Sequence, residues 1–300
     1  MADKRRTKDV YAVILVGGKG KRLRPLSTGK RPKAFLSITR DRKTMFKRTL
    51  ERIRKIILPS HIIVVANVAH SHLVKRDLPR IGKNLLLEPV SRNTAPAITF
   101  AALTLKKRLG NAVMFVVQAD QYIKDERPYL DSIKIGIDFV FCNNDALVVF
   151  GLKPAFPATE YGYIQLQVPS SKPRARHIYK VRRFLEKPDL NKARKFLKDG
   201  SYLWNTGAFV FTAETIFSAM KRFVPEIISG FADLNSVSRG YKKLPDISID
   251  YAVMEKADNI HCVKGSYQWQ DVGSFKSLKE VLRRESRAFI EHSGKITKII

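Results

Sequence analysis

Short apolar runs alternate with amphipathic segments along the first half of the chain, and this alternation limits the possible folds more than any other feature. Val10–Val16 is almost entirely apolar and ends at a pair of glycines, which is typical of a strand buried on both faces. After it, Phe46, Leu50 and Ile53 recur at helical spacing among basic residues. Further strand-like runs follow at 62–66, 85–87, 112–117 and 147–152. The alternation predicts an α/β fold: a Rossmann-like, mostly parallel mixed sheet with helices on both faces.

The second half of the chain has a less regular pattern. The runs 163–168, 178–184 and 208–212 are strand-like, and 213–223 is helix-like. The last residues alternate around Ser293-Gly294, as in a hairpin. We expect a basic tail at 1–9, one domain at 10–285 made of the parts 10–150 and 151–285, and the start of a short C-terminal β extension at 286–300.

The charge balance points to anionic partners. Lys and Arg number 56 and Asp and Glu 27, a formal net charge of +29. This excess favours nucleotides, sugar phosphates, nucleic acid or a lipid surface, with general surface basicity as the alternative. The two cysteines, Cys142 and Cys262, exclude a disulfide scaffold and a cysteine-based zinc cluster. The first apolar run is too short for a signal peptide or a membrane span, so we expect a soluble, cytoplasmic protein.

A basic, glycine-rich loop follows the first expected strand. In Gly17-Gly18-Lys19-Gly20-Lys21-Arg22-Leu23, the glycines permit close approach of a phosphate, and cations lie beside the backbone N–H donors. Leu23 stands where the dinucleotide fingerprint has its third glycine, and the Gly-Lys-Ser/Thr ending of a Walker A loop is absent. More cations follow, among them Lys33. The loop predicts polyphosphate binding, with a plain tight turn as the alternative.

Six segments in order extend this prediction over almost the whole chain. Besides the loop with its basic continuation, they are EPVSRNTAPAI at 88–98, FLEKP at 184–188, WNTGAF at 204–209, ISIDY at 247–251 and DVGSF at 271–275. Together they resemble the signatures of the sugar nucleotidyltransferases. The segment at 88–98 narrows the resemblance to the mannose-1-phosphate guanylyltransferase family.

The resemblance implies a nucleotide-diphospho-sugar transferase fold and a reaction of GTP with mannose-1-phosphate to give GDP-mannose and pyrophosphate, with Mg²⁺ as cofactor. The attacking sugar-phosphate oxygen is already anionic, so no general base is required. Catalysis would then consist of positioning and charge neutralisation. No membrane partner is expected, and nucleic acid is disfavoured because the chain has no recognised nucleic-acid module. A homodimer is one option for its assembly.

The resemblance assigns four residues to the chemistry. Arg22 and Lys33 would stabilise charge on the triphosphate, with a surface cation as the alternative for each. Asp120 follows an apolar run, and ligands collect at strand ends in open α/β sheets. Asp120 and Asp271 would hold Mg²⁺ between them. The alternative for an isolated aspartate after a strand is a turn former.

The other assignments divide between the nucleotide and the sugar phosphate. Glu88 offers two acceptor oxygens to the N1–H and N2–H₂ donors of guanine, with the balancing of Arg92 as the alternative. Thr94 would also cap the helix that follows it. The nucleotide set is Leu15, Gly17, Gly18, Lys19, Gly20, Glu88, Arg92, Asn93 and Thr94. The sugar-phosphate set is Gly151, Tyr161, Gly162, Glu186, Lys187, Asn205, Gly207 and Asp250, of which Asp250 could equally cap a helix.

Two departures from the family pattern keep alternatives open. The usual Pro-Ala-Asp-His is Gln118-Ala119-Asp120-Gln121 here, and the usual Glu-Thr-Gly is Ala158-Thr159-Glu160. These changes leave room for another sugar-1-phosphate or another base. A GDP-sugar-binding regulator without catalysis is a further alternative, although the charged residues that the chemistry needs are all present.

Overall fold

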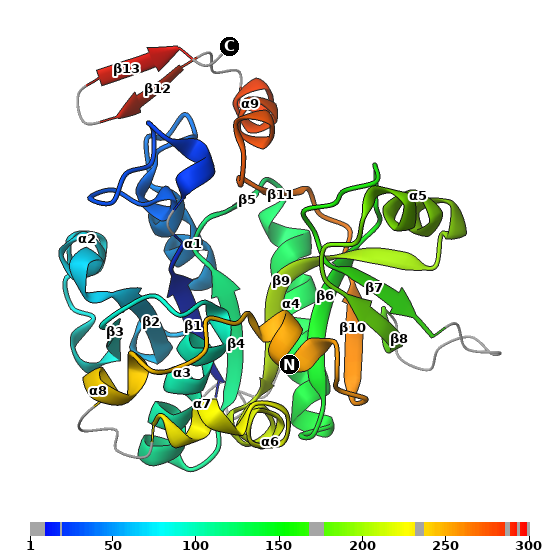
Figure 1. Cartoon of the computed structure of the whole chain (residues 1–300). Helices are drawn as coiled ribbons and strands as arrows, with labels where there is room; N and C mark the ends of the chain where they lie inside the picture. The colour runs from blue at the N-terminus through cyan, green and yellow to red at the C-terminus, as the bar shows by residue number, and fades with distance from the viewer. Residues whose placement is uncertain are drawn as a thin grey trace.

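The computed structural model of the protein describes residues 10–18, 20–167, 177–231, 237–285, 289–292 and 295–298. Within them, nine strands form one mixed sheet in the order β3-β2-β1-β4-β9-β6-β10-β8-β7 (Figure 1). Their bounds are β1 Val10–Val16, β2 Ile62–Asn67, β3 Leu85–Glu88, β4 Val113–Gln118, β6 Leu147–Leu152, β7 Tyr163–Leu166, β8 Ile178–Leu185, β9 Tyr202–Thr212 and β10 Ile260–Lys264. The expected tail at 1–9, Lys19 and Val168 lie outside the described residues.

In the described residues, two short ladders are separate from this sheet. β5 Gln121–Ile123 pairs with β11 Trp269–Asp271, and β12 Phe289–His292 pairs with β13 Lys295–Lys298. Both pairings are antiparallel. The second ladder is the hairpin expected near the C-terminus. The first joins two distant parts of the chain: β5 begins directly after Asp120, and β11 ends at Asp271, the other residue of the predicted metal pair.

Parallel and antiparallel pairing separate along the sheet. β3, β2, β1 and β4 are parallel, as are β6 and β10. β9 runs antiparallel between β4 and β6, and β8 and β7 complete the far edge in antiparallel pairing. The expected α/β class is confirmed, and the antiparallel strands explain why the second half of the sequence has a less regular pattern.

β9 is longer than its sequence pattern predicts. The expected strand at 208–212 begins in fact at Tyr202, so the WNTG segment lies within a strand. Trp204 pairs with Tyr163 of β7 and with Leu152 of β6, and both partners are buried. This pairing on both sides outweighs the low strand preference of Asn205 and Gly207.

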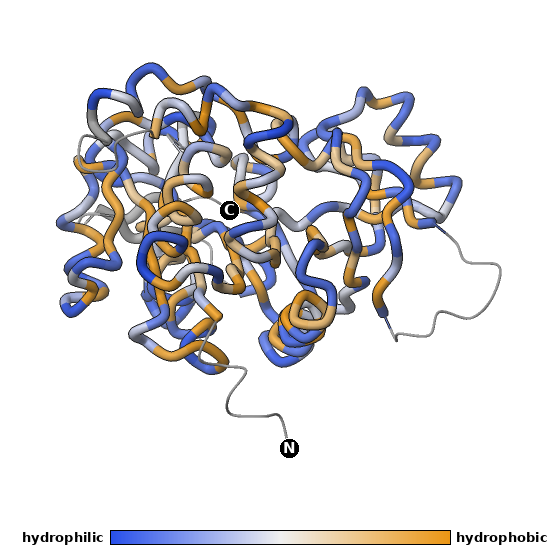
Figure 2. The backbone as a smooth tube through the Cα atoms, turned by 90° about the horizontal axis from the view of Figure 1, so that it is seen from below, coloured by the Kyte–Doolittle hydropathy of each residue, from blue (hydrophilic) through white to orange (hydrophobic). Residues whose placement is uncertain are grey.

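Helices cover both faces of the sheet (Figure 1). On β1, Ile14 faces an apolar cluster that includes residues of α1, α2 and α4, whereas Leu15 faces a cluster with α3, α6 and α7. Hydrophobic and hydrophilic stretches alternate along the backbone, and the outermost turns include many hydrophilic stretches (Figure 2). The helices are α1 Met45–Ile53, α2 Ser71–Asp77, α3 Thr94–Leu109, α4 Glu126–Cys142, α5 Leu190–Asp199, α6 Ala213–Phe223, α7 Pro225–Ser229, α8 Val237–Tyr241 and α9 Phe275–Arg284.

A third apolar cluster lies behind the glycine loop. It joins Leu23 and Leu26 of that loop to Tyr122 of β5, Val272 after β11, and Leu278 of α9. The chain forms 3₁₀ turns here at Lys21–Leu23 and Lys33–Phe35. A π-helical turn at Asp250–Met254 packs in the same cluster as α3 and α6. In the described part of the chain, no helix has the length and apolar character that crossing a membrane would need.

Candidate active site

A cavity of about 560 Å³ opens at the carboxyl ends of β1 and β4. β1 lies between β2 and β4, so the chain reverses its winding direction there, and such switch points are where α/β sheets bind ligands. The cavity volume lies within the range usual for ligand pockets. Eighteen predicted site residues line it: Leu15, Gly17, Gly18, Gly20, Arg22, Lys33, Glu88, Asn93, Thr94, Asp120, Tyr161, Gly162, Glu186, Lys187, Asn205, Gly207, Asp250 and Asp271.

Lys33 lies between two carboxylates in this cavity. Its Nζ is 2.7 Å from Oδ2 of Asp120 and 3.0 Å from Oδ1 of Asp271. The Lys33 side chain is only 9% exposed. Burial lowers the pKa of Lys33, but the two carboxylates more than offset this, and the pKa is raised. Lys33 is therefore a buried, charged ammonium whose charge depends on these aspartates.

The two aspartates are suited to a hard cation. Asp120 and Asp271 bring carboxylate oxygens within 3.0 Å of a single cationic atom, although they are 151 positions apart in the sequence. In the described residues, no third acidic, histidine or cysteine side chain joins them. Mg²⁺ typically uses one or two carboxylates together with substrate phosphates, so the pair fits that ion when a phosphorylated ligand is bound.

Arg22 reaches across the mouth of the cavity. Its Nη1 is 2.5 Å from Oε1 of Glu160, in the turn between β6 and β7. A Cβ atom on Gly273 would lie 2.9 Å from Nη2 of Arg22 and 2.9 Å from Oδ2 of Asp271. The guanidinium therefore lies close over the backbone of Gly273, and a larger residue there would push the ends of the Arg22 and Asp271 side chains aside.

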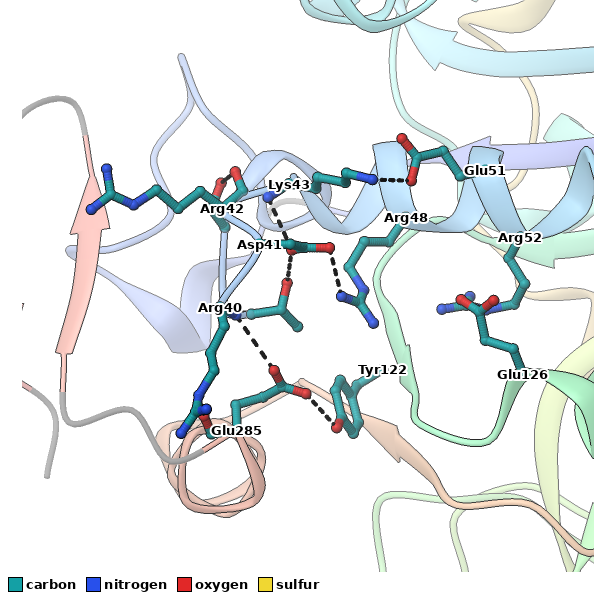
Figure 3. Close-up of polar contacts among 12 residues, drawn as sticks. Arg40, Asp41, Arg42, Lys43, Arg48, Glu51, Arg52, Tyr122, Glu126 and Glu285 are labelled. Atoms are coloured by element: carbon teal, nitrogen blue, oxygen red, sulfur yellow. Dashed lines mark hydrogen bonds and ion pairs between the residues drawn. The ribbon is translucent and has the colours of Figure 1, made fainter.

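A polar network supports the β5–β11 ladder from behind (Figure 3). Gln121 of β5 points into the cavity, and the next residue, Tyr122, donates to Oε1 of Glu285 at 2.7 Å. Nε of Arg40 donates to the backbone oxygen of Glu285 at 2.6 Å. These contacts, together with the third apolar cluster, hold β5, which directly follows Asp120, against the C-terminal end of α9. The ladder pairs Gln121 with Asp271, so the network holds the two aspartates indirectly.

Glu88 is a buried carboxylate at the end of β3 that still lines the cavity. It is 4% exposed, and its Oε1 accepts a hydrogen bond from the hydroxyl of Tyr241 in α8. Burial raises the pKa of Glu88 to about 7, although the Tyr241 bond acts in the opposite direction. One carboxylate oxygen thus accepts from Tyr241, and in the part of the chain that the structure describes no hydrogen bond engages the other, which can accept from a ligand.

Glu88 should make stability depend on pH. Its folded pKa lies above the unfolded value near 4.5, so the folded protein binds more protons between pH 4.5 and 7. Stability from this group is present below pH 4.5 and is lost as the pH rises to about 7. In Glu88→Gln, the free energy of unfolding should therefore fall less over this pH range than in the wild type, by up to about 3 kcal/mol. Urea unfolding of both proteins at about pH 4.5, 6 and 7.5 tests this, and parallel curves would contradict it.

The start of α3 forms the cavity wall next to Glu88. Asn93, with φ of 66°, caps the helix and accepts from the Thr94 backbone. The expected cap, Thr94, is instead the first helical residue, because its Oγ1 accepts from the backbone of Ile249 at 2.9 Å. Arg92 does not line the cavity, because its guanidinium donates to the backbone oxygen of Lys242.

Charged and amide side chains line the opposite wall. Nζ of Lys187 is 2.6 Å from Oε1 of Glu186, and Nδ2 of Asn205 donates to Oδ1 of Asp250 at 3.0 Å. Burial and the nearby Glu186 raise the pKa of Asp250 to about 7. Burial also raises the pKa of Glu186, against the opposing effect of Lys187. Asp250 is the first residue of the π-helical turn and Ile249 holds the cap position, so Asp250 is not the helix cap that was the alternative for it.

The two glutamines that depart from the family pattern meet at Gly207. A Cβ atom there, at φ of 70°, would lie 3.0 Å from Nε2 of Gln118 and 3.3 Å from Nε2 of Gln121. Nε2 of Gln121 also donates to the backbone oxygen of Thr206 at 2.6 Å. This wall of the cavity is therefore rich in amide donors.

Two predicted residues, Arg92 and Gly151, do not line the cavity, and several lining residues were not predicted from the sequence. Gly151 is not at the cavity; a Cβ atom on it would meet Leu203 and Cys262, so this glycine serves strand packing. Lys19 is outside the described residues. The additional lining residues are Val65, Ser91, Ala97, Thr206, Asp246, Ser248, Trp269 and Gly273. Most of them stand beside motif residues in the sequence, which is the one local signal that could have indicated them.

Comparison with known proteins gives consistent matches. A model of the family described as nucleotidyl transferase matches residues 11–287. A mannose-1-phosphate guanylyltransferase of Klebsiella pneumoniae is 36% identical over 289 residues, which cover 92% of this chain and 60% of that protein. The chain thus spans about three fifths of the length of this curated relative.

Two solved structures have similar folds and are more than 25% identical. A Thermus thermophilus protein described as mannose-1-phosphate geranyltransferase is 33% identical, with a TM-score of 0.79, over 91% of this chain and 79% of that one. A Helicobacter pylori protein described as mannose-6-phosphate isomerase is 29% identical, with a TM-score of 0.71, over 88% of this chain and 100% of that one.

Proposed function

Because this chain belongs to the nucleotidyl transferase family, we propose that it transfers the GMP group of GTP to mannose-1-phosphate, giving GDP-mannose and pyrophosphate. The observation that carries the proposal is the contact of Lys33 with both Asp120 and Asp271 in one cavity with Glu88 and Lys187. The name of the Klebsiella pneumoniae relative supports the choice of base and sugar. The two free cysteines agree with a reducing compartment such as the cytoplasm.

The reaction forms one bond and breaks one. A phosphate oxygen of the sugar phosphate attacks the α-phosphorus of GTP, and the bond from that phosphorus to the bridging oxygen of pyrophosphate breaks. Arg22 and Lys33 place positive charge where the leaving pyrophosphate gains negative charge. Lys187 holds the sugar phosphate, and Glu186 and Asn205 accept and donate to sugar hydroxyls. No proton has to move before the attack, because the nucleophile is already an anion.

The carboxylates of Asp120 and Asp271 form a donor set that suits a divalent metal when a phosphorylated substrate is bound. Asp120 and Asp271 would hold it, and Mg²⁺ is the ion that this donor set and phosphate oxygens suit. When bound, it would neutralise phosphate charge and hold the α-phosphate in line. Lys33 would then turn from the aspartates toward the phosphates, because its ammonium and the metal compete for the same carboxylate oxygens.

A specific observation favours a second candidate substrate. The amide donors of Gln118 and Gln121 beside Gly207 replace the usual residues of the family, and they face the part of the cavity assigned to the sugar. A different hexose-1-phosphate, or a sugar-1-phosphate with an added acceptor group, would use these donors. The same reaction would then run on a different sugar.

An assay of pyrophosphate release tests the proposal. The protein with Mg²⁺ is given GTP, ATP, UTP or dTTP, each with mannose-1-phosphate, glucose-1-phosphate or another sugar-1-phosphate. We expect release with GTP and mannose-1-phosphate to exceed the other pairs by at least about tenfold in kcat/KM. Faster release with a different sugar supports the second candidate, and absence of release with every pair contradicts the proposal.

Glu88 should determine the preference for guanine. If its free oxygen accepts from the guanine edge, Glu88→Gln replaces an anionic acceptor by a neutral amide that can also present a donor. A hydrogen bond to a charged group contributes about 1.5–3 kcal/mol, so the GTP-to-ATP ratio of kcat/KM should fall about 10- to 100-fold. An unchanged ratio would show that another group reads the base.

A further inference from the structure

Glu160 forms an ion pair with Arg22, one of the two cations that the proposed reaction places at the phosphates. Its Oε1 lies 2.5 Å from Nη1 of Arg22, and both residues line the cavity. Arg22 comes from the nucleotide wall and Glu160 from the sugar wall, so the pair crosses the cavity mouth.

Both partners project from well-anchored backbone. Tyr161, directly after Glu160, is buried between Trp204 and Trp269, and its hydroxyl accepts from Gln270 at 2.9 Å. The backbone oxygen of Gly162 accepts from the backbone of Asn205 at 2.8 Å. This side of the pair therefore has a fixed position.

The Arg22 side is equally fixed. Leu23 is completely buried in the third apolar cluster, and its backbone N–H donates to the oxygen of Gly20 at 2.9 Å. The Arg22 guanidinium lies over Gly273 next to Asp271. The side chains of Arg22 and Glu160 are themselves 58% and 49% exposed, so an incoming anion can reach the pair.

We propose that Glu160 is a positioning residue that acts through Arg22: it holds the guanidinium across the cavity mouth in the free protein, and a polyphosphate takes its place on binding. This rests on the proposed function, because the polyphosphate is GTP or the pyrophosphate product. A phosphate oxygen and the Glu160 carboxylate compete for the same N–H donors. An exposed ion pair is weak, so the exchange lowers polyphosphate affinity only modestly while it keeps Arg22 pointed at the binding position.

The experiment is a double-mutant cycle read by isothermal titration calorimetry. Inorganic pyrophosphate and GTP are titrated, with Mg²⁺ at low salt, into the full chain, Glu160→Gln, Arg22→Gln and the double variant. We expect Glu160→Gln to tighten binding about two- to fivefold, because a competitor is removed. We expect Arg22→Gln to weaken binding at least about tenfold, and Glu160→Gln to change nothing further in that background.

Glu51→Gln is the matched control. Glu51 does not line the cavity, and it forms a comparable exposed pair with Lys43 at 2.7 Å. This variant makes the same chemical change away from the Arg22 pair and should change affinity by less than about twofold. Equal tightening in this control, or tightening by Glu160→Gln that persists without Arg22, means a general charge effect and overturns the proposal. Unchanged or weaker binding in Glu160→Gln also overturns it.

The cycle separates this inference from the proposed function. Binding of GTP by the wild-type chain without any response to Glu160→Gln contradicts only the role of Glu160. Failure of every variant to bind GTP or pyrophosphate contradicts the transfer reaction, and the role of Glu160 with it. Thermal melts of all variants complete the test, since Glu160 is half-exposed and its replacement should leave the melting temperature unchanged.

Discussion

Asp271→Asn should lower the rate of pyrophosphate release by about 10³-fold and leave the protein folded. The carboxylate lies beside both Lys33 and Arg22, where the phosphates are expected to bind. The amide keeps the size of the side chain but removes the charge that a divalent cation needs. Because Lys33 retains its contact with Asp120, little stability should be lost.

The measurement is the initial rate at saturating GTP and sugar phosphate over a range of Mg²⁺ concentrations. Asp120→Asn should behave in the same way, with a higher Mg²⁺ requirement for any residual rate. Asp131→Asn is the control, since this carboxylate pairs with Lys134 on the exposed side of α4. More than about a tenth of the wild-type rate in Asp271→Asn would remove Asp271 from the site.

The first half of the fold follows from local sequence signals. The runs that predict strands correspond to β1, β2, β3, β4 and β6 to within a few residues. All but β3 at the sheet edge are apolar and buried on both faces. The resemblance based on six motifs is likewise confirmed by the family match over 11–287. Such motifs are readable because close phosphate approach and buried charge restrict the residue types at each position.

The errors arise where distant contacts outweigh local preference. Asn205 and Gly207 would usually interrupt a strand, yet β6 and β7 pair on either side of β9 and extend it through them. Thr94 resembles a cap, but its hydroxyl is used by Ile249, and Asn93 tolerates the positive φ that the cap position requires here. Gly151 lies in β6, where the side chain of Leu203 packs against it and leaves no room for a Cβ atom. Its role in packing follows from this distant contact and not from the local sequence.

The contacts inside the site were equally invisible in the sequence. Arg22 and Glu160 are 138 positions apart, and Lys33 and Asp271 are 238 apart. Local patterns predict that the basic residues bind phosphate. They contain no information about which acidic side chain each basic side chain contacts in the free protein. The sheet topology supplies it, because the ends of β1 and β4 and the β5–β11 ladder converge on one cavity.

Lys33→Met should destabilise the protein in the absence of divalent metal, and Mg²⁺ should restore part of the loss. Removal of the ammonium leaves Asp120 and Asp271 close together without a cation, and their side chains are 15% and 27% exposed. Breaking a buried ion pair costs about 3–5 kcal/mol, and partial exposure of the carboxylates brings the expected cost to about 2–3 kcal/mol. Turnover should also fall, by at least about 10²-fold, because the pyrophosphate loses a cation.

Thermal melts in EDTA and in millimolar Mg²⁺ measure both effects. In the wild-type protein Lys33 competes with the metal, so Mg²⁺ alone should raise the melting temperature little; in Lys33→Met the freed carboxylates should bind it and raise the melting temperature clearly. Lys43→Met, which breaks an exposed pair with Glu51, should cost less than about 1 kcal/mol and show no added response to Mg²⁺. If Lys33→Met is as stable in EDTA as the wild type, the ammonium does not balance the charge of the two aspartates. That result would contradict the hypothesis that Lys33 and a divalent metal compete for the same carboxylates.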